Sequence, residues 1–224
     1  MALTDLAVGV EATAFALILL GRSARYAGDD RRRERHRWLV VSFAATGVAA
    51  ITGAAIHGLY ADRADPRRRR LWRLSMGAID MGGLSAWRIG AALALSDGRR
   101  RVVDRVATFA HGAYLAILTR ADPPFSVAIA TYLSGALFLS ASLLTRLGRR
   151  TERRASAIAL VGLGLTFGGA IVQLRGIAVH PRLFDRNATY HAIQAIAVAC
   201  FFAAADGLIR GSTDRSDVQA AERT

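Results

Sequence analysis

The sequence contains no lysine, and all thirty of its basic residues are arginine. A retinal chromophore is attached through a Schiff base to a lysine amine, so this absence excludes a rhodopsin-type photoreceptor or pump. Cysteine is almost as scarce. The single Cys200 cannot form a disulfide within the chain, and we expect it to be a small buried apolar residue.

Apolar residues are abundant instead, at 53% of the 224 residues. They fall in runs long enough to cross a hydrocarbon core about 30 Å thick, and because backbone amides in lipid must be paired within their own segment, such runs predict helices. We predict an all-α integral membrane bundle of seven transmembrane helices within residues 1–209, followed by a polar C-terminal tail over residues 210–224. The predicted spans are 2–21, 38–60, 71–96, 102–119, 124–145, 155–179 and 187–209.

The net charge of +13 lies largely in short arginine clusters between the apolar runs, for example at residues 31–33, 67–70 and 99–101. This placement favours contact with lipid headgroup phosphates over nucleic acid binding. Arginines are most frequent in the loops after the first, third and fifth spans and in the tail, which predicts an N-terminus outside and a C-terminus inside. Arginine without lysine, together with much alanine, is typical of a GC-rich bacterial genome. We therefore expect a multi-pass protein of the bacterial inner membrane, in contact with membrane lipids.

Four ionisable residues are predicted to lie inside the spans, where a central charge costs about 2.5–3.5 kcal/mol on insertion scales. They are Glu11, His57, Asp80 and His191. Counted at about 1.5 Å per residue from the span ends, all four lie in the outer half, within about 10 Å of one another along the membrane normal. This common depth predicts a polar site inside the bundle.

The start of the last span carries further hydrogen-bonding side chains. Asn187, His191 and Gln194 are spaced i, i+4 and i+7, so they share one helical stripe. Tyr190 lies directly beside them. We expect Asn187, Tyr190 and Gln194 to contact a bound substrate.

Structural interpretations of the charged residues stay open beside these. A lone histidine within a membrane is usually a hydrogen-bonded packing residue, which is the interpretation we favour for His111 and His180. His111 lies toward the cytoplasmic end of its span, on the side away from the polar site. Asp80 or Glu11 could instead form a structural ion pair with Arg88.

Packing roles are also expected for some amides and glycines. Gln173 and Gln194 could form hydrogen bonds between neighbouring helices. Gly164 and Gly168 have the spacing of small residues at a helix interface, so they predict a close helix contact.

The residues Gly53-x-x-x-His57, Asp80 and Asn187-x-x-x-His191 form a pattern that resembles the superfamily of alkaline ceramidases and adiponectin-receptor-type proteins. Those seven-helix membrane hydrolases carry Ser-x-x-x-His on an early helix, Asp on the next and His-x-x-x-His on the last. Gly53 and Asn187 depart from this pattern, since they replace a serine and a histidine. The stretch AVHPRLFDRNATYHAIQ, at residues 178–194, also resembles bacterial and plant seven-helix membrane proteins of unknown activity, whose signature is Phe-Asn-His-Asn-x-x-Tyr-His-x-Ile-Gln.

The resemblance to the superfamily implies a zinc-dependent hydrolase that acts on a lipid amide or ester. His57 and His191 would be two zinc ligands, and Asp80 a third ligand or a base beside the bound water. Asparagine is a weak zinc ligand, so Asn187 leaves the set one imidazole short. Glu11 and His180 are the candidates to fill that place. Asp80 and Glu11 are thus the candidate catalytic acids, and catalysis could also have been lost.

Three other functions are compatible with the same residues. The polar pocket could belong to a non-catalytic membrane subunit or lipid-binding protein, with partner membrane subunits. His57 and His191 could be the axial ligands of haem b. A transporter could use intramembrane acids and histidines as a proton relay, although the sequence has no clear pair of Gly/Pro-broken helices of the kind found in many transporters.

Overall fold

The structure is a computed structural model of the chain, and it describes residues 2–26, 29–60, 62, 64–180 and 184–211. Within these ranges the chain is helical, and the only strand-like pairing described is one isolated bridge between His180 and Phe184. The all-α prediction is confirmed. The elements are α1 (Ala2–Gly21), the 3-10 helix η1 (Ser23–Tyr26), α2 (Asp30–Gly58), α3 (Pro66–Ala94), α4 (Asp97–Arg120), α5 (Phe125–Leu144), α6 (Arg153–Arg175) and α7 (Arg186–Arg210).

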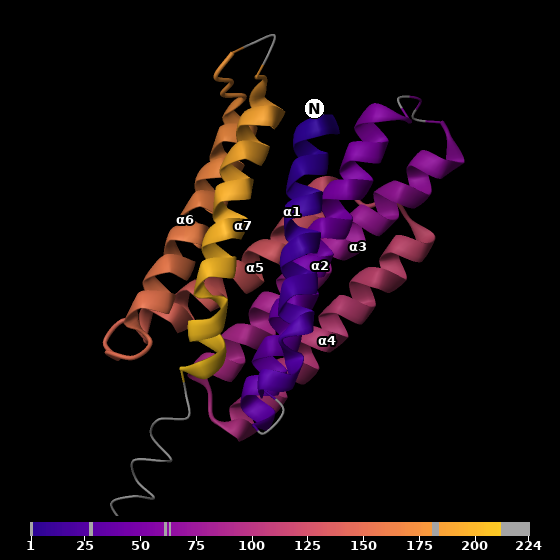
Figure 1. Cartoon of the computed structure of the whole chain (residues 1–224). Coiled ribbons are helices and arrows are strands. Elements are labelled where there is room, and N and C mark those ends of the chain that lie inside the picture. Colours follow the sequence, from indigo (N-terminus) through magenta and orange to yellow (C-terminus); the bar gives the residue numbers. More distant parts are fainter. Residues whose placement is uncertain (1, 27–28, 61, 63, 181–183, 212–224) are drawn as a thin grey trace, which may run out of the picture.

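The helices form a bundle in which α1 and α2 stand between two groups (Figure 1). The α6–α7 pair lies on one side and α3 and α4 lie on the other, while α5 crosses between the two groups and contacts both α3 and α6. Helix α2 contacts α1, α3 and α7, while α3 contacts α2, α4 and α5. Helix α4 is peripheral, because in the described part of the chain its backbone runs close to that of α3 alone.

The starts of α2, α3 and α7 are set by aspartate caps. The Asp29 side chain accepts hydrogen bonds from the backbone N–H groups of Arg31 and Arg32, and so begins α2 at Asp30. This start lies eight residues before the predicted span. Hydropathy misses the first two turns of α2 because they are rich in arginine, which is a good helix former but not apolar. Helix α3 begins in the same way, with Asp65 as its N-cap and Pro66 in the first turn.

The core has a main cluster and a smaller satellite. The main cluster joins α1, α2, α3, α5, α6 and α7 around fully buried side chains such as Leu19, Leu143 and Ile209. The satellite joins α3, α4 and α5, and consists of Met76, Tyr114, Leu118 and Ala128. Tyr114 and Leu118 are the only buried residues of α4. Apolar burial therefore holds α4 less firmly than the other helices.

Five described helices are long and apolar enough to cross a membrane, namely α1, α2, α5, α6 and α7. They leave large apolar side chains exposed on the outside of the bundle, for example Leu17, Leu174 and Ile196. Five such helices indicate a multi-pass membrane protein. Helices α3 and α4 do not reach the same hydropathy, because charged residues such as Asp80, Arg88 and Asp104 interrupt them. Their crossing of the membrane stays a prediction.

Glycine allows a close helix contact, but not where the sequence predicted it. A Cβ on Gly135 of α5 would lie 2.3 Å from the carbonyl oxygen of Gly83 on α3, so only glycine permits this approach. Gly164 and Gly168 of α6 have no atom of another helix within 4 Å of the Cβ position. The prediction that these two mediate a close contact is therefore wrong.

Candidate functional site

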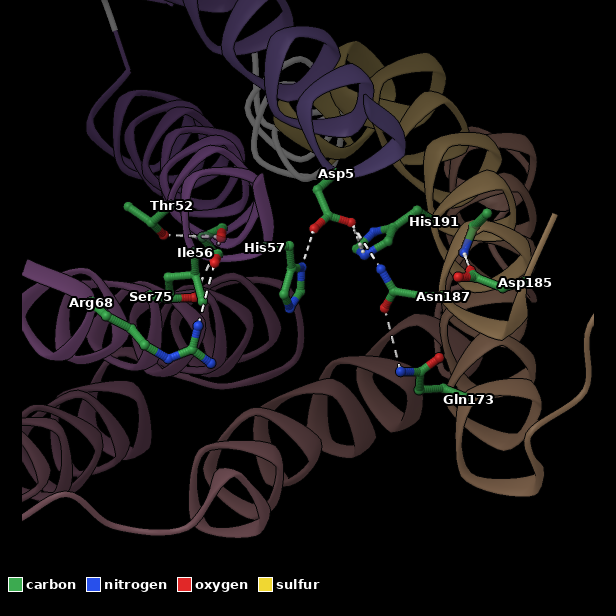
Figure 2. Close-up of polar contacts among 12 residues, drawn as sticks. Asp5, Thr52, Ile56, His57, Arg68, Ser75, Gln173, Asp185, Asn187 and His191 are labelled. Atoms are coloured by element: carbon green, nitrogen blue, oxygen red, sulfur yellow. Dashed lines mark hydrogen bonds and ion pairs between the residues drawn. The ribbon is translucent and has the colours of Figure 1, made fainter. Parts of the chain in front are cut away.

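A buried carboxylate joins two histidines at the end of the bundle where α1 starts. Asp5 lies in the first turns of α1 and is 1% exposed. Its Oδ2 lies 2.7 Å from His57 Nδ1 on α2, and its Oδ1 lies 2.6 Å from His191 Nε2 on α7. Figure 2 shows the carboxylate between the two imidazoles. One acid thus ties three helices together.

Two amides extend this arrangement. Asn187 Nδ2 donates to Asp5 Oδ1 at 3.2 Å, and Gln173 Nε2 on α6 donates to Asn187 Oδ1 at 3.4 Å (Figure 2). We call Asp5, His57, Gln173, Asn187 and His191 the Asp5 network. Gln173 bonds across two helices, as expected from the sequence.

The ends of α2 and α7 are held in place by side chains outside the network. Arg68, near the start of α3, donates to the carbonyl oxygens of Ile56 at 3.3 Å and Tyr60 at 2.6 Å. It thereby satisfies carbonyls at the end of α2, next to His57. Asp185 caps α7 by accepting from the N–H of Ala188 at 2.9 Å, which fixes the turn that carries Asn187.

The charge of Asp5 determines which imidazole nitrogens are free. An ionised carboxylate only accepts hydrogen bonds, so His57 Nδ1 and His191 Nε2 carry the protons they share with it. That leaves His57 Nε2 and His191 Nδ1 as basic nitrogens when the rings are neutral. His191 Nδ1 is buried and has no hydrogen-bond partner among the described residues. The His57 side chain is 39% exposed, so this side of the network opens to the surface of the bundle.

Gly53 also lies beside the network. A Cβ on Gly53 would be 3.7 Å from Asp5 Oδ2. Four of the five positions of the sequence pattern therefore lie around Asp5. They are Gly53, His57, Asn187 and His191. Asp5 itself is not part of that pattern.

The fifth position, Asp80, lies elsewhere. The structure pairs its carboxylate with His111 Nδ1 of α4, in a contact with both side chains largely buried. This differs from the expectation that Asp80 joins His57 and His191, because the Asp80 side chain is turned toward α4 and not toward α2 and α7. It also differs from the expectation that His111 lies apart from the intramembrane acids.

The remaining predicted residues have separate environments. Glu11 of α1 is half-buried, and the described residues include no ion-pair or side-chain hydrogen-bond partner for it. Arg88 donates to Thr108 and lies over the Trp38 ring at 4.4 Å, so it does not pair with Asp80 or Glu11. The ring of Tyr190 lies edge-to-face against His191, with centroids 4.8 Å apart.

Gln194 lines an internal cavity of about 60 Å³ between α2, α3, α5, α6 and α7. Other polar residues on its wall are Ser42, Thr46, Tyr132 and Thr166. By volume it has room for about four water molecules. It is too small to hold a lipid, so a lipid would have to approach the Asp5 network from outside the bundle.

The donor types of the Asp5 network can be compared with those that zinc requires. Zinc takes imidazole nitrogens and carboxylate oxygens, and histidines that bind it commonly donate their other N–H to a carboxylate. His57 and His191 do so to Asp5, and His191 Nδ1 is left without a partner. The set is one imidazole short, since Asn187 replaces the histidine of the pattern. No group of three or more His, Cys, Asp or Glu side chains in the described ranges is arranged to hold a metal ion.

Haem b fits the same residues less well. Bis-histidine ligation places the iron and its macrocycle between two imidazoles. Here the Asp5 carboxylate lies between His57 and His191 and bonds to both.

Asp5 is the functional candidate that sequence reasoning missed. It lies three residues into the first predicted span, His191 lies four residues into the last, and His57 lies three residues before the outer end of the second. Choosing the acid whose predicted depth in the membrane is nearest to that of His57 and His191 would have selected Asp5. Glu11 and Asp80 lie about two turns deeper.

These features define a multi-pass helical membrane protein with a buried aspartate that bridges two histidines. The chain matches a family of unknown function, DUF6962, over residues 1–210, and it belongs to that family. No curated protein and no solved structure matches it.

Proposed function

We propose that this protein is a membrane-embedded hydrolase that acts on a lipid amide or ester, with the Asp5 network as its active site. One observation carries the proposal: Gly53, His57, Asn187 and His191 surround a single buried carboxylate. These are four of the positions through which the sequence resembles the ceramidase and adiponectin-receptor superfamily. In this proposal Asp5 takes the place that the resemblance gives to Asp80.

The residues of the network would divide the work. Asp5 orients both imidazoles and stabilises them when they are protonated. His57 and His191 would hold zinc, which when bound lowers the pKa of a water and makes it a nucleophile at neutral pH. In His191 the nitrogen left to bind the metal is Nδ1, which has no partner among the described residues. Asn187 and Tyr190 would contact the substrate, whereas Gln194 lines the cavity of about 60 Å³, which is too small for a lipid.

A second candidate is a non-catalytic membrane subunit or lipid-binding protein that uses the same pocket. The side chains at positions 53 and 187 favour it, because glycine supplies no hydroxyl and the Asn187 amide already bonds to both Asp5 and Gln173. An amide in that place completes a hydrogen-bond network, which binds helices or a lipid without requiring a metal.

The setting of either function is also a proposal. The arginine distribution supports an N-terminus outside, which puts the Asp5 network in the outer leaflet of the membrane. The composition supports the inner membrane of a bacterium. The scissile group of a lipid would then reach the network from the end of the bundle where the His57 side chain is partly exposed.

Elemental analysis of detergent-purified protein tests the proposal. We expect zinc in the wild type, and loss of zinc in both His57→Ala and His191→Ala. Asp80→Asn is the matched control, because it changes a buried acid that lies outside the network and should retain the metal. Zinc content should be paired with release of fatty acid from lipid amides and esters by the same samples.

The outcomes separate the two candidates. Zinc and hydrolysis that are lost together in the His57 and His191 variants support the hydrolase. A wild type that stays free of metal after incubation with zinc, and hydrolyses neither class of lipid, contradicts it. If His191→Ala then still folds and elutes normally, the non-catalytic function is favoured.

A further inference from the structure

A buried arginine without a hydrogen-bond acceptor lies at the other end of the bundle. Arg35 is on the inner face of α2, in its second turn, and is 1% exposed. Its Nε, Nη1 and Nη2 atoms are all buried and have no acceptor among the described residues. Burying a guanidinium costs several kcal/mol unless it is paired, and nearly all buried polar groups in proteins are bonded.

The acids near Arg35 are already engaged. Glu152 accepts from Arg146 Nη1 through both of its oxygens, at 3.0 and 2.9 Å. It also accepts from Arg149 at 3.4 Å. Asp29 caps α2 and pairs with Arg32 at 3.3 Å. Neither carboxylate provides a direct hydrogen bond to the Arg35 guanidinium.

The local charge favours an anion. The charged groups that influence Arg35 include Asp29, Arg32, Arg146 and Glu152. With Arg35 itself and Arg149, which also bonds to Glu152, these are four cations and two anions, so positive charge is in excess. Arg146 is 7% exposed, and its buried Nε also lacks an acceptor in the described structure. Unfilled guanidinium donors thus come from two neighbouring arginines.

We propose that Arg35 and Arg146 form a binding site for a phosphate group. The planar guanidinium fork matches two phosphate oxygens and can bind them with parallel charge-assisted hydrogen bonds. The site lies where α2 begins, near the turn from α5 to α6 and the end of α7, at the opposite end of the bundle from the start of α1 (Figure 1). Headgroups of phospholipids occur at this level of a membrane helix, and so does free phosphate from the adjoining water.

Thermal unfolding of the full-length protein tests this site. Detergent-purified protein is prepared without phosphate and titrated with inorganic phosphate, against sodium chloride of equal ionic strength. In a second series it is titrated with phosphatidylglycerol, against a glycolipid that lacks phosphate. We expect phosphate or phosphatidylglycerol to raise the Tm beyond its control, because a ligand that binds only the folded state stabilises it.

Arg35→Gln should weaken the apparent affinity by about tenfold or more, since it removes charge-assisted hydrogen bonds. Arg154→Gln is the matched control, because Arg154 is an exposed arginine at the same end of the bundle and its loss should leave the response unchanged. Arg35→Lys keeps the charge but loses the fork, and should also bind more weakly. It serves as the test variant if Arg35→Gln does not fold.

Each result decides something. A response to inorganic phosphate identifies a site for the free anion, whereas a response to phosphatidylglycerol alone identifies a headgroup site. Either result supports the proposal. A wild type that responds to neither ligand beyond its control overturns it, and so does an Arg35 variant whose response equals that of the wild type. The test does not depend on the Asp5 network, which lies at the other end of the molecule.

Discussion

Two buried carboxylates bind imidazoles in this bundle, and their settings differ. Asp5 bonds to His57 and His191 and connects α1, α2 and α7, which are all part of the main core. Asp80 bonds to His111 alone and connects α3 to the peripheral helix α4. A carboxylate bonded to imidazole is therefore a candidate active site around Asp5, whereas at Asp80 it holds one helix against another. A second imidazole on the same carboxylate and the further amide partners Asn187 and Gln173 distinguish the Asp5 group.

The largest expected effect on stability comes from replacing Asp5, the centre of the Asp5 network. Asp5→Ala leaves two imidazoles and the Asn187 amide without their shared acceptor, and should lower the free energy of unfolding by about 3–5 kcal/mol. Reversible denaturation in mixed micelles measures this loss. Asp5→Asn keeps one acceptor oxygen and should cost less. Unchanged stability in Asp5→Ala would show that the carboxylate does not hold the three helices together.

The Asp80–His111 pair should matter less to global stability. Asp80→Ala should cost about 1–3 kcal/mol, the penalty of leaving one buried polar group without its partner. Since in the described chain the backbone of α4 runs close to α3 alone and α4 has only two buried side chains, the effect should appear as faster amide exchange within α4. Hydrogen exchange with mass spectrometry measures it. Equal increases across α1, α2 and α7 would contradict the separation of the two carboxylates.

Restoring the His-x-x-x-His pattern of the superfamily at positions 187 and 191 should improve metal binding at the Asp5 network, and not at the Asp80–His111 pair. Asn187→His adds the missing imidazole beside Asp5 and should raise zinc affinity about tenfold or more. Competition with a chromophoric chelator gives the affinity. Gln173→His is the control, because it adds an imidazole one step further from Asp5. A gain in Gln173→His but not in Asn187→His would place the metal elsewhere.

The smallest effect is expected at an exposed ion pair that links α2 to α4. Arg31 donates to both oxygens of Asp97, at 3.0 and 2.9 Å, and this hydrogen bond lowers the pKa of Asp97. A lowered pKa adds stability above the unfolded pKa, and that stability is lost as the pH falls through the folded value. Arg31→Ala should therefore reduce stability slightly at neutral pH, with the difference from wild type vanishing in acid. Denaturation curves at neutral and at acid pH measure the difference in stability between variant and wild type. A difference that grows in acid would contradict the expected direction.

The helices could be predicted from the sequence because apolar length determines them, and the predicted spans agree with the described helices to within a few residues at most ends. The main error was the start of α2. There the capping residue Asp29 and good helix formers extend the helix through polar sequence, which hydropathy does not detect.

The site was only partly predictable. His57, Asn187 and His191 could be found because intramembrane polar residues stand out and helical spacing aligns them. Asp80 was assigned to the wrong group because depth along a helix does not say which neighbour a side chain faces. Asp5 was overlooked because it lies close to the start of its span, where an acid needs no special explanation in sequence terms. Its partners become visible only when three helices are brought together.

Nitrogen-15 NMR of the histidine side chains tests the central claim most directly. The chain has five histidines, and the claim is that Asp5, and not Asp80, organises His57 and His191. The account predicts that Asp5→Asn shifts the imidazole signals of His57 and His191 and leaves that of His111 in place, while Asp80→Asn shifts His111 alone. Movement of the His57 and His191 signals in Asp80→Asn, with none in Asp5→Asn, would contradict it.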